Sequence, residues 1–142
     1  MTDERHQYWQ GYTRALADAL RLRDWRVELE KAVPPPDAEG QANHPLAWCN
    51  CVFGRKVIEI RLADDFEKQP PSEQRYGIVH ELIHAHLDLA DCVVFYDLKG
   101  WLRPDQDQTV WKSYSRAREY AVDALAEVVA PFMPLPPAED GH

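Results

Sequence analysis

The chain has 142 residues and a mass of 16.4 kDa, a size that corresponds to one domain with its own hydrophobic core. Hydrophobic residues make up 45% of it and charged residues 28%, and this composition excludes a disordered or fibrous protein. The net charge is −8, from 16 basic and 24 acidic residues. Because a phosphate-binding surface normally needs a basic excess, we expect no nucleic-acid partner.

The sequence also indicates where the protein is found. No apolar run approaches the roughly 20 residues that span a bilayer, and residues 1–7 are polar with no signal-peptide core behind them. We therefore expect no membrane association and a cytoplasmic location, which is the host cytoplasm if the protein is phage-encoded.

The first half of the chain predicts a helix followed by strands. Apolar residues recur every three or four positions over 3–23, which predicts an amphipathic helix. Residues 25–30 alternate apolar and charged side chains, as in a strand with one buried face. A proline-rich segment then predicts a loop over 34–46, and Gly54 with Arg55 predicts a hairpin between strands at 48–53 and 56–62.

The second half predicts two helices. Proline and serine at 70–72 are a helix-start signal, and the helix over 72–89 is apolar on nearly every side, so we expect it in the middle of the domain. Residues 92–108 fit either a longer helix or a short strand. A last helix is predicted over 109–130. Its expected inner face consists of Val110, Tyr114, Ala117, Ala121, Ala124, Leu125 and Val128.

The domain boundaries follow from the end of this last helix. Four prolines between 131 and 137 end it, and 138–142 is a predicted disordered tail. Residues 1–137 are thus predicted to form a single domain.

The three cysteines are predicted to be reduced thiols. Cys49 and Cys51 are separated by one residue, which is shorter than the usual spacing of zinc ligands, and no second Cys or His pair accompanies them. Residues i and i+2 of a strand share a face, so two half-buried strand cysteines are the better interpretation. Cys92 has no partner pattern.

A metal-binding pattern lies inside the central helix. His80, Glu81 and His84 form the motif H-E-x-x-H, and residues four apart on a helix project from one face, so both imidazoles can meet one Zn²⁺. Glu81 is turned about 100° from His80, where a base for a metal-activated water belongs. The motif arises by chance roughly once in fifty shuffled sequences of this composition. The alternative to a metal site is that the buried histidines hydrogen-bond to core carbonyls. Each buried polar group left without a partner would then destabilise the fold by about 1–3 kcal/mol.

The third zinc ligand must come from another segment. His86 faces away from His80 on the same helix, and Asp88 lies about 12 Å along the axis. The last helix offers Glu119, which would complete a His₂Glu site, with Asp123 one turn on as an acceptor for the second N–H of a ligating histidine. A solvated stripe of carboxylates extended by Glu127 is the alternative to Glu119 as ligand, and His44 is the alternative ligand.

These residues resemble a known group of enzymes. H-E-x-x-H followed by Glu119-x-x-x-Asp123 is the gluzincin arrangement, and residues 57–130 resemble small zinc peptidases of the ImmA/IrrE type and their phage relatives. Val122 and Leu125 depart from the usual downstream motif, and no helix-turn-helix is attached.

The resemblance implies an α+β, minimal zincin-like fold, in which a small antiparallel sheet packs on the active-site helix between N- and C-terminal helices. An edge strand would bind an extended peptide by strand addition, and the strand at 56–62 is the obvious candidate. Zn²⁺ would polarise the scissile carbonyl while Glu81 takes the proton of the attacking water. Tyr114, Tyr120 and His86 are candidates to stabilise the oxyanion, and Tyr114 fits a core position better.

Two functions of different classes follow. The leading one is a zinc-dependent endopeptidase that acts on a peptide or protein substrate as a monomer or weak oligomer. The alternative is a catalytically silent zincin-like protein that binds a protein partner, with zinc as a structural ion. An intact Glu81 favours the enzyme, because a structural site has no use for a free carboxylate beside the metal. A third interpretation, a helical partner-binding protein without metal, would require both the H-E-x-x-H motif and the Glu119/Asp123 pair to be coincidental.

Overall fold

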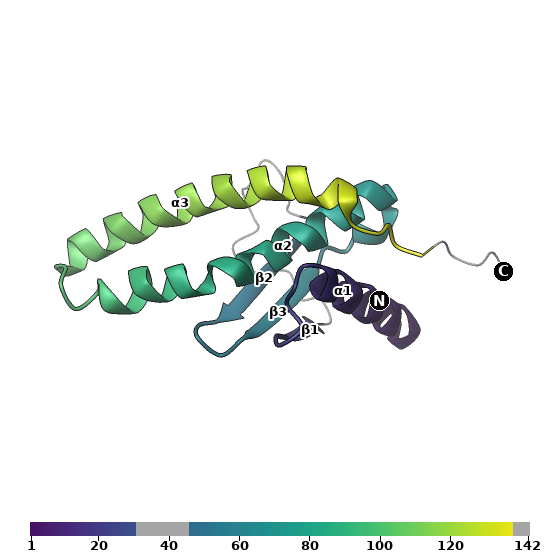
Figure 1. The fold of residues 1–142 in the computed structure, drawn as a ribbon, viewed down its shortest axis with the longest axis horizontal. Coiled ribbons are helices and arrows are strands. Elements are labelled where there is room, and N and C mark those ends of the chain that lie inside the picture. Colours follow the sequence, from purple (N-terminus) through teal and green to yellow (C-terminus); the bar gives the residue numbers. More distant parts are fainter. Residues whose placement is uncertain (31–45, 138–142) are drawn as a thin grey trace.

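A computed structural model describes residues 1–30 and 46–137, and this part of the chain forms three α-helices and one three-stranded sheet (Figure 1). The class is α+β, as predicted. Both His44 and the predicted tail at 138–142 lie outside the described residues. The elements are α1 Asp3–Ala19, β1 Arg26–Glu30, β2 Ala47–Val52, β3 Val57–Leu62, α2 Pro71–Cys92 and α3 Pro104–Val129, with short helical turns at Phe66–Lys68, Val93–Asp97 and Ala130–Phe132.

The sheet is mixed, so the prediction of an antiparallel sheet is wrong for one of its two pairings. The strand order is β1-β3-β2, with β2 antiparallel to β3 across the predicted hairpin and β1 parallel to β3. Alternating hydrophobicity identifies the buried face of a strand but not its neighbour or direction. β3 is therefore the central strand, and the expectation that it accepts a substrate strand is also wrong. Its backbone already pairs on both sides.

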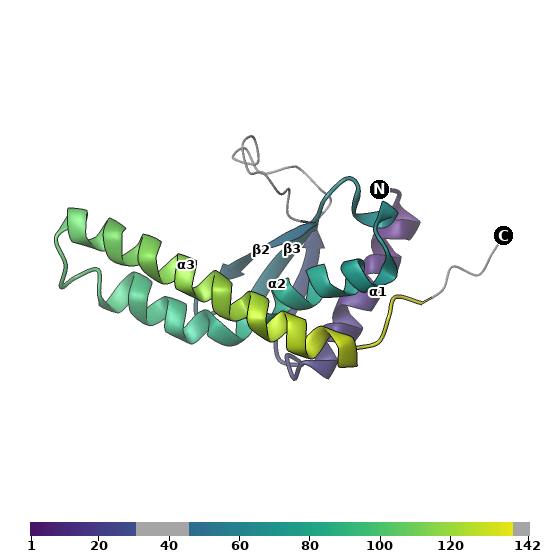
Figure 2. The ribbon, with the colours of Figure 1, turned by 90° about the horizontal axis from the view of Figure 1, so that it is seen from above.

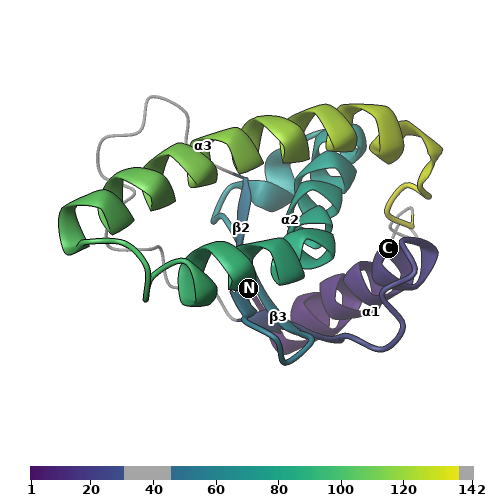
Figure 3. The same cartoon turned by 60° about the vertical axis from the view of Figure 1, so that its left-hand side comes forward.

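Helix α2 occupies the middle of the molecule, as its apolar sequence predicts. It packs against α1, β2 and α3, and Figure 1 shows it between the sheet and α3. In Figure 2 α3 crosses in front of α2, and Figure 3 shows the same elements from a third side. It begins with a proline in its first turn and buries Ile78, Val79, Leu82, Ile83 and Ala85. In the described part of the chain, no helix combines the length and apolarity that a membrane span requires.

The segment after α2 follows one of the two alternatives that the sequence left open, whereas the start and the buried face of α3 differ from the prediction. Residues 93–97 continue as a helical turn and not as a strand, and α3 begins at Pro104. Five of the predicted inner residues are exposed, whereas Val122, Ala126 and Ala130 are buried; the exposed ones are Ala117, Ala121, Ala124, Leu125 and Val128. The face of α3 that packs on α2 also carries polar side chains. The positions of the largest apolar residues therefore do not identify the buried face of this helix.

Candidate metal centre

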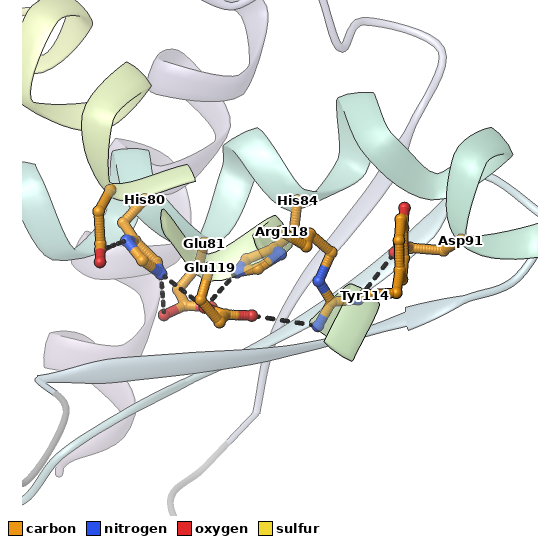
Figure 4. A network of polar contacts seen from close by, with 8 residues as sticks. His80, Glu81, His84, Asp91, Tyr114, Arg118 and Glu119 are labelled. Atoms are coloured by element: carbon orange, nitrogen blue, oxygen red, sulfur yellow. Dashed lines mark hydrogen bonds and ion pairs between the residues drawn. The ribbon is translucent and has the colours of Figure 1, made fainter. Parts of the chain in front are cut away.

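The structure brings His80, His84 and Glu119 together from two helices (Figure 4). Glu119 Oε2 lies 3.6 Å from His80 Nε2 and 3.4 Å from His84 Nε2. One ligand atom from each residue lies within 4.8 Å of the other two. The helical spacing within α2 places the two imidazole nitrogens side by side, and the packing of α3 along α2 brings the carboxylate oxygen to them. Three donor atoms thus surround one point.

These separations fit a zinc ion. Zn²⁺ binds imidazole nitrogen and carboxylate oxygen at about 2.0–2.2 Å in tetrahedral sites, which keeps its ligand atoms roughly 3.3–3.6 Å apart. The two distances to Glu119 Oε2 are 3.4 and 3.6 Å. Two imidazoles and one carboxylate are also the donor set of catalytic zinc sites. In spacing and chemistry alike, the residues present suit this ion.

Glu81 flanks this group of donors. Its Oε1 lies 4.0 Å from His80 Nε2, and only 7% of the residue is exposed. Burial raises the pKa of Glu81, while the charges of His80 and His84 oppose that shift. A carboxylate with a raised pKa accepts and returns a proton closer to neutral pH than an ordinary glutamate does.

Asp123 lies where a partner of a ligating histidine is expected. Its Oδ1 is 3.1 Å from His80 Nδ1, so it can accept that N–H and leave Nε2 directed towards Glu119. Glu127, one turn further along α3, is exposed. The alternative of one solvated carboxylate stripe therefore does not describe Glu119 and Asp123, which contact the histidine pair, whereas Glu127 makes no such contact within the described residues.

A second polar network anchors Glu119, and sequence reasoning missed it. The Arg118 guanidinium donates through Nη2 to Glu119 Oε1 at 3.1 Å and through Nη1 to Asp91 Oδ2 at 2.9 Å. Tyr114 Oη donates to the other oxygen of Asp91 at 2.8 Å, and Asp91 is only 1% exposed. The one sequence signal for this network was an aspartate near the end of a helix that is apolar on nearly every side.

The electrostatics of the cluster favour a cation. Burial opposes protonation of His80, but its hydrogen bond with Glu119 and the charges of Glu81 and Asp123 raise its pKa overall. Burial likewise opposes ionisation of Glu119, yet hydrogen bonds from His80, His84 and Arg118 hold its pKa far below the ordinary value. Glu119 is therefore a carboxylate, and the negative potential that raises the pKa of His80 would also attract a divalent ion.

An open cleft of about 490 Å³ runs past these residues, between β2 and the two long helices. Strand β2 forms one wall, and the side chain of Glu119 is 45% exposed at the opposite side. The lining residues outside the metal centre are mostly aromatic, polar or sulfur-containing: Ala47, Trp48, Cys49, Asn50, Cys51, Phe53, Asp91, Trp111 and Arg118.

The remaining sequence candidates lie apart from the reacting groups. His86 Nε2 lies 2.9 Å from the carbonyl of Leu20, in agreement with the prediction that it faces away. Tyr120 is 70% exposed, and neither it nor Tyr114 lines the cleft. Burial and the hydrogen bond to Asp91 raise the pKa of Tyr114 to about 12. Among the described residues, Arg118 is the cationic side chain that lines the cleft beside Glu119.

The strand cysteines are free thiols, half-buried on one face of β2, as predicted. A hydrogen-bonding contact with Cys51, burial and the neighbouring Glu81 carboxylate raise the pKa of Cys49 well above its ordinary value. Cys92 is also a free thiol.

Comparisons of the chain with protein-family models, with curated proteins and with solved structures found no match. The functional interpretation accordingly depends on the geometry of the site.

Proposed function

We propose that the protein is a zinc-dependent endopeptidase with a zincin-like fold. The observation that carries the proposal is the convergence of His80, His84 and Glu119 at ligand separations suited to zinc, with Glu81 beside them in an open cleft. The H-E-x-x-H spacing and the geometry are independent, because the motif concerns one helix and Glu119 comes from another.

The roles of the residues follow from their positions. His80, His84 and Glu119 would hold the ion, which would polarise a peptide carbonyl and acidify a water molecule. Glu81 accepts the proton of the attacking water and passes it to the leaving amine, a task that its raised pKa assists. Asp123 fixes the tautomer of His80 through Nδ1, and Arg118 holds Oε1 of Glu119 so that Oε2 faces the imidazoles.

Strand β2 is the element best placed to bind the substrate. In the part of the chain that the structure describes, β2 pairs with β3 on one side only, and residues 47–51 line the cleft. An extended peptide could add to its open edge through main-chain hydrogen bonds, which would bring a scissile bond towards Glu81. This role replaces the one that the sequence assigned to the segment 56–62.

The alternative function, a partner-binding protein with a structural zinc, would be favoured by a closed fourth coordination position. Structural zinc sites usually have four protein ligands. Here three donors meet beside a cleft, and the side chains of Glu119 and Asp123 are 45% and 52% exposed. Access of solvent to the site favours the enzyme.

The test of catalysis is Glu81→Gln, because an amide cannot accept the proton of water. Wild type and variant would be incubated with a pool of unrelated peptides, and new termini identified by mass spectrometry. The variant should keep its zinc and its fold but lose at least about 10²–10⁴-fold in hydrolysis. Glu73→Gln, at an exposed position in the first turn of α2, is the matched control and should cleave as wild type does. Equal cleavage by wild type and Glu81→Gln would refute the proposal.

A further inference from the structure

A thiol lies beside the proposed catalytic base. Cys49 pairs with Ile60 in the β2–β3 ladder and lines the cleft with Glu81 and His84. Its sulfur, a carboxylate oxygen of Glu81 and a ring nitrogen of His84 all lie within 4.8 Å of one another. Residues from an edge strand and from α2 therefore form a second cluster of donors that includes neither His80 nor Glu119.

The chemistry of this cluster differs from that of the first. Thiolate, imidazole and carboxylate are all zinc ligands, and a thiolate selects softer ions over Mg²⁺ or Ca²⁺. The cluster lies largely buried in the wall of the cleft, since Glu81 and His84 are buried and Cys49 is partly buried. Cys51 lies two residues along the same strand but does not belong to the group of mutually close donors.

We propose that Cys49, Glu81 and His84 form a second metal position for a thiophilic divalent ion, which overlaps the first position through His84. As the sulfur–metal bond forms, the thiol proton leaves to solvent and the ion takes its place. Because Glu81 becomes a ligand there, an ion in this position removes the base. The inhibition rests on the proposed function, whereas the metal position itself does not.

The experiment uses the full chain carrying His80→Ala, which disables the first position and leaves the second intact. Co²⁺ is titrated under a phosphine reductant, and a sulfur-to-cobalt charge-transfer band in the near ultraviolet is recorded. We expect the band to saturate at one equivalent. It should be lost in His80→Ala/Cys49→Ser and retained in the matched control His80→Ala/Cys51→Ser. Glu119→Ala, at a half-exposed side chain, disables the first position independently and should give the same band.

The outcomes separate this proposal from the proposed function. If Co²⁺ gives no sulfur band in His80→Ala or Glu119→Ala, or if the band persists without Cys49, the second position is refuted. If the band behaves as expected while wild type lacks a site dependent on His80 and Glu119, only the zinc peptidase is refuted. If the band is lost in His80→Ala/Cys51→Ser but retained in His80→Ala/Cys49→Ser, the thiolate ligand is Cys51 and the proposal is also overturned.

Discussion

Replacement of Glu119 by alanine should separate a metal ligand from an ordinary surface carboxylate. The variant loses the oxygen that lies 3.4 and 3.6 Å from the two imidazole nitrogens. Zinc binding to structural sites is worth about 10–16 kcal/mol, so one of roughly four ligands accounts for about 3 kcal/mol. The dissociation constant of zinc should therefore rise by at least about 100-fold.

Alanine variants at two further positions of α3, Asp123 and Glu127, show how large a loss of zinc affinity is expected without removal of a ligand. Asp123→Ala removes only the acceptor of the His80 Nδ1–H, and water can partly replace a side chain that is 52% exposed, so we expect a loss of about 10-fold. Glu127→Ala should have no effect, because this residue lies two turns beyond Glu119, about 12 Å along the axis.

Zinc affinity would be measured by competition with a chelator, in a Cys49→Ser background so that the second position does not contribute. The expected order of loss is Glu119, then Asp123, then Glu127. Equal affinities for the three variants would contradict the assignment and place the third ligand elsewhere, with His44→Ala as the next variant.

Three further predictions concern the surroundings of the site. Arg118→Met leaves the buried Asp91 without its cation, and urea unfolding should show a loss of about 3 kcal/mol, part of which Asp91→Asn restores in the double variant. His86→Ala should leave zinc content unchanged in metal analysis, because its ring bonds to a carbonyl at the end of α1. Burial opposes ionisation of Glu67, but hydrogen bonds from Trp9 and Arg5 lower its pKa overall. Its contribution to the stability of the metal-free chain should therefore be present above about pH 4.5 and disappear as the pH falls through the lowered pKa, and Glu67→Gln should flatten that acid-side loss in pH-dependent melting curves.

The helices and the histidine pair could be predicted because their signals are local. The 3.6-residue period of an α-helix places His80 and His84 on one face whatever surrounds them. The same spacing placed Asp123 one turn from Glu119, and the structure puts its carboxylate against the ring of His80.

Long-range pairing could not be predicted in the same way. The alternation within 26–30 and 57–62 indicates a buried face but not that these two strands are parallel neighbours. The order of the strands places β2 at the edge of the sheet that residues 1–30 and 46–137 form, and β2 in turn brings Cys49 to Glu81. Neither the sequence of β2 nor that of α2 by itself indicates that Cys49 and Glu81 will be close.

Arg118 illustrates a different limit. In the sequence it lies two residues after Arg116 and directly before Glu119, and such a charged stretch is typical of a solvated helix surface. Its function in the structure depends on Asp91, which is 27 residues away and buried at the end of α2. A buried carboxylate requires a partner, but the sequence does not say which cation supplies it.

Metal analysis of the purified protein tests the central claim most directly. Mass spectrometry under native conditions, with elemental analysis of the same sample, should find one zinc per chain in wild type and none in the His80→Ala/His84→Ala variant. The variant should also melt at a lower temperature, because it loses the stabilisation that a bound ion provides. A folded wild-type chain that carries no zinc and takes none up would contradict the account.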